Sequence, residues 1–168
     1  MTPFPHALKL FSLGSLLVVA ACGSSPMGSM DSMGSMGTKG MMSSSSTAMT
    51  AQLSGASEVP AVVTDATGKV EASLNTGSNV LTWKITYSGL SGPATAAHFH
   101  GPAMVGQNAG VVLPISAPLA SPLTGSATLT ASQAADLMAG KWYVNVHTAA
   151  NPNGEARGQV GLASAPMQ

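Results

Sequence analysis

Three of the four histidines of this 168-residue chain fall in two short motifs, and imidazole is the commonest protein ligand for metals. His98 and His100 lie in HFHGPAMVG, residues 98–106, and His147 lies in YVNVHT, residues 143–148. An H-x-H pair with a distant third histidine is a familiar way to hold copper or zinc. The alternative is that these imidazoles hydrogen-bond to backbone carbonyls at loop ends and bind no metal.

Strand geometry decides whether these histidines can meet. In an extended strand, residues i and i+2 project to the same face, so His98 and His100 share a face while Phe99 points the other way. In KWYVNVHT the same alternation predicts two faces, one with Trp142, Val144 and Val146 and the other with Tyr143, Asn145 and His147. If the two strands are neighbours in a sheet, the three imidazoles converge on one point.

Methionines form a second group of candidate metal ligands. Seven of the eleven lie in GSSPMGSMDSMGSMGTKGMMSSSSTAMT, residues 23–50, and these are Met27, Met30, Met33, Met36, Met41, Met42 and Met49. A thioether is a soft ligand that suits Cu(I), and the M-x-x-M spacing resembles the methionine motifs of bacterial periplasmic copper-resistance proteins and copper transporters. The alternative is a GSM repeat without function. Met104 and Met138 are candidate additional sulfur ligands beside the histidines.

The N-terminus predicts a signal that is cleaved before a lipidated cysteine. Its apolar run from Leu10 to Ala21 is too short to span a bilayer. It ends in Val-Ala-Ala-Cys, residues 19–22, and small residues directly before a cysteine resemble the lipobox of bacterial lipoproteins. Because Cys22 is the chain's one cysteine, this interpretation is preferred to an ordinary secretory signal. Gly23 in place of aspartate favours the outer membrane, by resemblance to enteric sorting rules.

These features divide the chain into four parts. We expect a signal peptide at 1–21, a lipidated and disordered Met/Gly/Ser-rich linker at 22–49, a folded domain at 50–163, and a C-terminal tail at 164–168. The expected location is a bacterial membrane surface, either on the periplasmic face or on the outside of the cell. His6 lies in the part that is removed.

The composition argues against two classes of function. Six Lys+Arg balance six Asp+Glu, and only 7% of residues are charged. A nucleic-acid partner would need a basic stripe, so none is expected. There is no G-x-S-x-G motif, no thiol left if Cys22 is acylated, and no pair of carboxylates near the histidines in the sequence. We therefore expect no enzymatic activity.

The region from residue 50 onward reads as many short strands separated by turns. LTWKITYSGL alternates Leu81, Trp83 and Ile85 with polar residues, which is typical of a half-buried strand. Gly, Pro and Asn clusters separate the runs, and one helix is predicted in TASQAADLMAG, with Thr130 as N-cap and Gly140 as C-cap. This pattern predicts an all-β fold: an antiparallel Greek-key or immunoglobulin-like sandwich or barrel with one short helix.

The last hairpin is predicted at NPNGEARGQ. Gly154 is expected to supply the positive φ of the turn. Glu155 and Arg157 are two residues apart, so we expect them to share a strand face and to form a salt bridge that holds the hairpin.

Several segments together carry a family resemblance. LSGASEVPAV, TWKITYSGLSGPATAAHFHGPA, LTASQAADLMAGKWYVNVHT and NPNGEARGQV resemble, in order, the CHRD domain, which is repeated in the vertebrate developmental protein chordin and occurs singly in many bacterial secreted proteins. The resemblance covers residues 50–161. It implies an all-β extracytoplasmic module without an established enzymatic activity, and its H-x-H-G-P and Y-V-N-V-H-T motifs map to His98, His100 and His147.

Two hypotheses about function follow. The first is a membrane-anchored copper-binding protein, with a buffering, chaperone or resistance role, that uses the histidines and the methionine tract. The second is a metal-free adhesion or protein-interaction module in which the histidines are structural. The methionine tract favours the first hypothesis, and chordin's binding of protein ligands favours the second.

Overall fold

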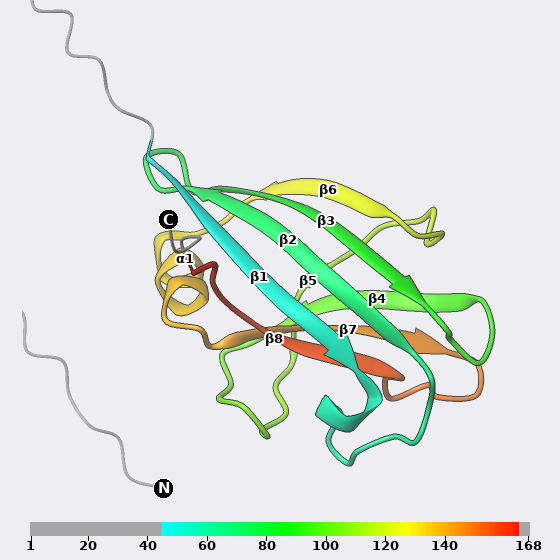
Figure 1. Cartoon of the computed structure of the whole chain (residues 1–168). Coiled ribbons are helices and arrows are strands. Elements are labelled where there is room, and N and C mark those ends of the chain that lie inside the picture. Colours follow the sequence, from blue (N-terminus) through cyan, green and yellow to red (C-terminus); the bar gives the residue numbers. More distant parts are fainter. Residues whose placement is uncertain (1–44, 165–168) are drawn as a thin grey trace, which may run out of the picture. The chain divides into compact units, whose positions relative to one another are not determined.

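The computed structural model describes residues 45–164, which form one antiparallel sheet of eight strands with one short α-helix (Figure 1). The strands are β1 (Ser46–Ser54), β2 (Thr67–Asn75), β3 (Val80–Ser88), β4 (Ala94–His100), β5 (Val111–Pro114), β6 (Leu123–Thr128), β7 (Trp142–Thr148) and β8 (Ala156–Leu162). The helices are the 3-10 turn η1 (Gly55–Ser57) and α1 (Ala131–Met138). The predicted all-β fold with one short helix is confirmed. Within the described part, no helix is both long and apolar enough to cross a bilayer.

Alternation of apolar and polar residues produces the strands, as β3 illustrates. Its Leu81, Trp83 and Ile85 are buried, whereas Thr82 and Lys84 between them are exposed. Burying one side of each strand fixes its register, because a slip of one residue would turn the apolar set toward water. The pairing of β2 with β3 runs without interruption from Thr67 opposite Ser88 to Asn75 opposite Val80.

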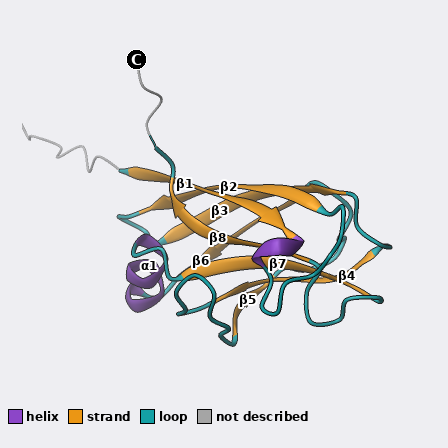
Figure 2. Cartoon of the chain, turned by 60° about the horizontal axis from the view of Figure 1, so that its bottom comes forward, coloured by secondary structure: helices purple, strands orange, loops and turns teal. Residues whose placement is uncertain are grey.

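The sheet curls so that its two halves face each other across the core. The strand order is β5-β4-β7-β8-β1-β2-β3-β6, and Figures 1 and 2 show β1, β2 and β3 on one side with β4, β5 and β7 on the other. The edge strands β5 and β6 are joined by residues 115–122, whose Ile115 is buried in the core. This connecting segment spans the side on which the sheet does not close.

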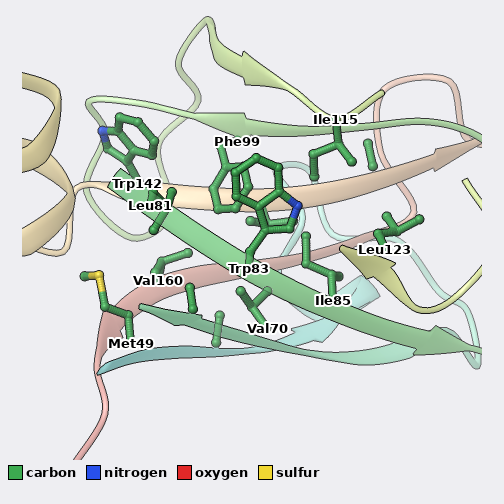
Figure 3. Packing of buried hydrophobic residues seen from close by; sticks show 14 of the residues in the cluster. Met49, Val70, Leu81, Trp83, Ile85, Phe99, Ile115, Leu123, Trp142 and Val160 are labelled. Atoms are coloured by element: carbon green, nitrogen blue, oxygen red, sulfur yellow. The ribbon is translucent and has the colours of Figure 1, made fainter. Parts of the chain in front are cut away.

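Aromatic side chains from the two halves of the curled sheet contact one another across the core. Trp83 of β3 and Phe99 of β4 meet edge to face with ring centroids 5.3 Å apart, although their strands lie on opposite halves of the sheet (Figure 3). Phe99 also contacts Trp142 of β7, at 6.1 Å between centroids. Gly125 of β6 lies directly against the Trp83 ring, where a Cβ would overlap it.

The helix α1 packs at one end of the sheet through Ala134 and Leu137, which are its buried residues. Thr130 caps its N-terminus in a capping box, because its hydroxyl accepts from the Gln133 backbone while the Gln133 side chain accepts from the Thr130 backbone. Ala139 is the C-cap, and Gly140 follows with φ of 70°. The predicted helix and N-cap are thus confirmed, and the predicted glycine lies one residue beyond the C-cap.

The folded domain begins slightly before the expected boundary at residue 50. β1 starts at Ser46 and pairs with β2 from that residue onward. Met49 is only 2% exposed and packs in the core (Figure 3). This methionine follows the tract in the sequence, but its environment is that of an ordinary core side chain.

Candidate metal centre

The pairing of β4 with β7 brings the two histidine motifs together. In this antiparallel pair His98 lies opposite Asn145, His100 opposite Tyr143, and Ala96 opposite His147. Phe99, between the two histidines, is fully buried on the core side. The predicted strand faces are therefore correct, and the condition that the two strands be neighbours is met.

The three imidazoles form a compact group. One ring nitrogen from each of His98, His100 and His147 lies within 4.8 Å of the others, and His98 Nδ1 is 3.1 Å from His147 Nε2. Zinc or copper held tetrahedrally with bonds of about 2.0–2.1 Å would place its nitrogen ligands about 3.3 Å apart. The His98–His147 pair already has such a spacing, and a modest closure of His100 would complete a three-nitrogen site.

Backbone carbonyls orient two of the three rings. His100 Nδ1 donates to the carbonyl of Ala109 at 3.0 Å, and His147 Nδ1 donates to the carbonyl of Pro152 at 3.0 Å. With the hydrogen on Nδ1, Nε2 is the atom of each ring that can offer a lone pair, and that of His147 lies 3.1 Å from His98 Nδ1. The metal-free alternative also predicted these two carbonyl bonds. They are equally typical of a metal-ligating histidine, which nearly always donates its other ring N–H to a carbonyl, carboxylate or water.

One of these lone pairs is buried without a partner. The Nε2 atom of His100 is inaccessible to solvent and has no hydrogen-bond partner among the described residues. Leaving a buried polar atom unsatisfied costs about 1–3 kcal/mol, and a bound cation would remove that cost.

Burial keeps two of the imidazoles in the form that binds metals. The pKa of His98 is lowered from its usual 6.5 by burial first, and then by the nearby His147 and His100. The pKa of His147 is lowered too, again by burial first; the hydrogen bond to Pro152 opposes this shift and His100 adds to it. Both rings are therefore neutral at pH 7, which is the state that coordinates a metal.

A loop packed on the outer face of the sheet supports His100. The Tyr143 ring stacks on His100 with 4.8 Å between centroids, and the Arg157 guanidinium carbon lies 3.5 Å from the centroid of the Tyr143 ring. Arg157 also donates to Asn108 Oδ1 at 2.8 Å and to the Gln107 carbonyl at 2.6 Å. These contacts hold the loop that supplies the Ala109 carbonyl to His100. As a result every residue of β7 is buried, on both of its faces.

The predicted Glu155–Arg157 salt bridge is wrong. Glu155 lies in the bend before β8, which begins at Ala156, so strand alternation does not place it beside Arg157. Its carboxylate accepts hydrogen bonds from Thr148, Ser91 and Thr64 at 2.6–2.8 Å. Gly154 does supply a positive φ, of 124°, to the turn, so that part of the prediction is confirmed.

Met104 and Met138, the two candidate additional sulfur ligands, lie at exposed positions. Met104 lies in the loop after β4 with its side chain 58% exposed, and Met138 ends α1 at 41% exposed. A metal-binding role for either one stays a prediction. Cys22 and the six tract methionines lie outside the described residues; these methionines are Met27, Met30, Met33, Met36, Met41 and Met42.

The sequence interpretation assigned no role to two residues that lie at the cluster. Asn145 Oδ1 is 3.0 Å from His147 Nε2. The carboxyl group of Glu58 is buried beside Arg157 and Asn145; burial raises its pKa to about 7, although both neighbours lower it. The position of Asn145, two residues before His147 on the same face, was a usable signal. Glu58 is remote in sequence and gave none.

Residues 49–160 match the family model of the CHRD domain. The chain belongs to the CHRD domain family. The match runs from β1 to β8 and includes all three clustered histidines, which confirms the resemblance found in the sequence. A comparison with curated proteins and one with solved structures each gave no match.

The Glu155 carboxylate generates a prediction about stability. Burial would raise its pKa, but the hydrogen bonds from Thr148, Ser91 and Thr64 outweigh burial and lower it from 4.5 to about 2. Because the folded-state pKa lies below the unfolded value, its contribution is complete above pH 4.5 and is lost as the pH falls toward 2. Glu155→Gln should lower the free energy of unfolding at pH 7 by about 1.5–3 kcal/mol and weaken its acid dependence between those pH values.

Urea unfolding at pH 7, 4 and 2.5 measures this effect. Glu71→Gln is the matched control, because Glu71 forms an exposed ion pair with Lys69 on β2, and exposed pairs contribute little. An unfolding free energy of Glu155→Gln equal to that of the unsubstituted protein at pH 7 would contradict a stabilising role for the Glu155 carboxylate.

Proposed function

We propose that this CHRD-domain protein is anchored to a membrane outside the cytoplasm and binds copper through His98, His100 and His147. The observation that carries the proposal is the convergence of three imidazole nitrogens within 4.8 Å, with two of the rings oriented by backbone carbonyls. The family is an extracellular-type domain, which agrees with the expected signal and lipidated Cys22.

The choice of copper rests on the two sets of ligands in one chain. Imidazole suits Cu(II) and zinc, whereas thioether suits Cu(I). A chain that carries both a histidine cluster and six closely spaced methionines is equipped for the two oxidation states of copper. Among divalent first-row metals, copper also binds such ligands most tightly. A buffering, chaperone or resistance role follows from this pairing.

The first test is Cu(II) titration of the mature chain, purified in detergent, against a competing chelator. The double variant His98→Ala, His100→Ala should lose Cu(II) binding and keep a β-type circular dichroism spectrum, because both side chains lie outside the apolar core. Thr95→Ala, an exposed position on the same strand, should bind as the unsubstituted protein does.

The pH dependence is part of the same test. Because the pKa values of His98 and His147 are lowered, proton competition should weaken Cu(II) binding only as the pH falls below about 6.5. Unchanged Cu(II) affinity in the double variant would refute the site. Tighter binding of zinc than of copper would refute the choice of metal, and no binding by either protein would favour a metal-free interaction module.

The methionine tract generates a separate prediction. Thioethers do not protonate in this range, so the tract should collect Cu(I) over a wide range of pH. Deleting residues 27–42 should lower the Cu(I) stoichiometry and spare Cu(II) binding at the domain. A Cu(I) probe competition with the two proteins measures this. Identical Cu(I) stoichiometry and affinity with and without the tract would leave it as a linker only.

The lipid anchor is tested at its cysteine. Cys22→Ser removes the thiol that would receive the lipid, so the protein should either leave the membrane fraction or retain its uncleaved signal. Fractionation of cells followed by mass measurement distinguishes these outcomes from the parent. A variant that is efficiently processed and still sediments with membranes would contradict the proposed anchor.

A further inference from the structure

We propose that Asn145 is a fourth ligand of the metal centre, binding through its side-chain oxygen, so that the domain selects Cu(II) over Cu(I). This inference rests on the proposed function and specifies the donor set of the same site.

The position of Asn145 in the sheet places it inside the histidine cluster. It lies directly opposite His98 across the β4–β7 pair and two residues before His147 on the same face of β7. Directly opposed side chains have Cβ atoms about 4.5–5.5 Å apart, which is within reach of a shared ion. The side chain is only 3% exposed, so water does not readily satisfy its oxygen.

The contact between Asn145 and His147 brings two acceptors together. Asn145 Oδ1 lies 3.0 Å from His147 Nε2. Since Nδ1 of His147 carries the hydrogen that bonds to the Pro152 carbonyl, the neutral ring has a lone pair on Nε2, and an amide oxygen has no hydrogen to give it. His98 Nδ1 can donate to that Nε2 at 3.1 Å, but this leaves Asn145 Oδ1 facing the same lone pair.

Either a proton or a metal ion would make this contact favourable. A second proton on His147 would place a cation beside two further imidazoles, those of His98 and His100, whose ring centroids lie 4.9 Å and 6.5 Å away. A metal ion instead accepts lone pairs from both atoms at once, together with the unpartnered Nε2 of His100. The arrangement of acceptors around the cluster is therefore that of a cation site.

Glu58 and Gly154 keep the amide of Asn145 in this orientation. The amide nitrogen of Asn145 lies on the side of the Glu58 carboxyl group. A Cβ at residue 154 would overlap both Glu58 Oε1 and Asn145 Nδ2, so glycine is required where the two groups meet. With its nitrogen turned toward Glu58, Asn145 presents its oxygen to the imidazoles.

This donor set discriminates between oxidation states. Cu(I) prefers soft sulfur ligands, whereas an amide oxygen with imidazoles suits a divalent ion. The domain would then hold Cu(II), and the softer methionine tract would hold Cu(I). One chain would thus keep the two oxidation states at different places.

Cu(II) competition titration and electron paramagnetic resonance of the mature chain in detergent test the role of Asn145. Asn145→Ala should weaken Cu(II) binding roughly 10- to 100-fold, the range seen when groups around a metal are removed, and should change the copper hyperfine splitting. Asn145→Asp retains an oxygen ligand and should bind Cu(II) more tightly than Asn145→Ala, although it loses the amide nitrogen that faces Glu58. Gln159→Ala is the control, since this amide donates to the carbonyls of Ala103 and Gly140 and not to an imidazole.

A measurement without substitution covers the case in which Asn145→Ala does not fold. In the unsubstituted chain saturated with Zn(II), the side-chain amide NMR signal of Asn145 should move as the metal binds. An unmoved signal, equal Cu(II) affinity and spectra in Asn145→Ala, or equal loss in the Ala and Asp variants would overturn the role of Asn145. Absence of Cu(II) and Zn(II) binding by the unsubstituted chain would instead refute the metal centre itself.

Discussion

The antiparallel pairing of β4 with β7 is the constraint on which both the core and the candidate metal centre depend. The same register that directs Phe99, Val144 and Val146 into the core directs His98, Asn145 and His147 to the other face. Because side chains alternate along a strand, neither set can move without the other. The packing free energy of the apolar face therefore also determines the spacing of the imidazoles.

Burial of the outer face of β7 shields part of the site from water, while His98 on β4 is half-buried. A chain with only 7% charged residues nevertheless buries Glu58, Glu155 and Arg157 around these strands. Two of them join loops to the sheet: Arg157 holds residues 107 and 108, while Glu155 binds Thr64 and Ser91. Arg157 thus holds the loop that lies against Tyr143 and that binds His100 through the Ala109 carbonyl.

Local patterns in the sequence were sufficient to predict the strands and the helix. The contacts between residues distant in sequence could not be predicted from such patterns. The alternation in β3, the capping box at Thr130 and the positive φ at Gly154 depend on residues close together in the chain. The partner of Glu155 could not be derived in that way, because Ser91 and Thr64 are distant in sequence and reach it only through the curl of the sheet. The convergence of the histidines was predictable only on the condition that β4 and β7 were neighbours.

The exact start of the domain and the covering of β7 by a loop could not be predicted from the sequence, for similar reasons. Met49 lies at the end of a stretch rich in Met, Gly and Ser, so composition alone assigned it to the linker, whereas its pairing partner Ala72 places it in the sheet. The loop that covers Tyr143 carries no periodic pattern, and its docking depends on Arg157 from the last strand. Both features follow from tertiary contacts that leave no local signature.

Because the sheet does not close, it leaves two strand edges at which copies of this domain could pair. A protein with zero formal net charge gains little protection from mutual electrostatic repulsion, and exposed strand edges are templates for aggregation. Here one edge, β5, is only four residues long and ends in Pro114, and the other, β6, directly follows Pro122. Proline cannot donate to a neighbouring strand. The short edge and the prolines thus limit edge-to-edge pairing between copies, in a molecule that has few charges with which to keep copies apart.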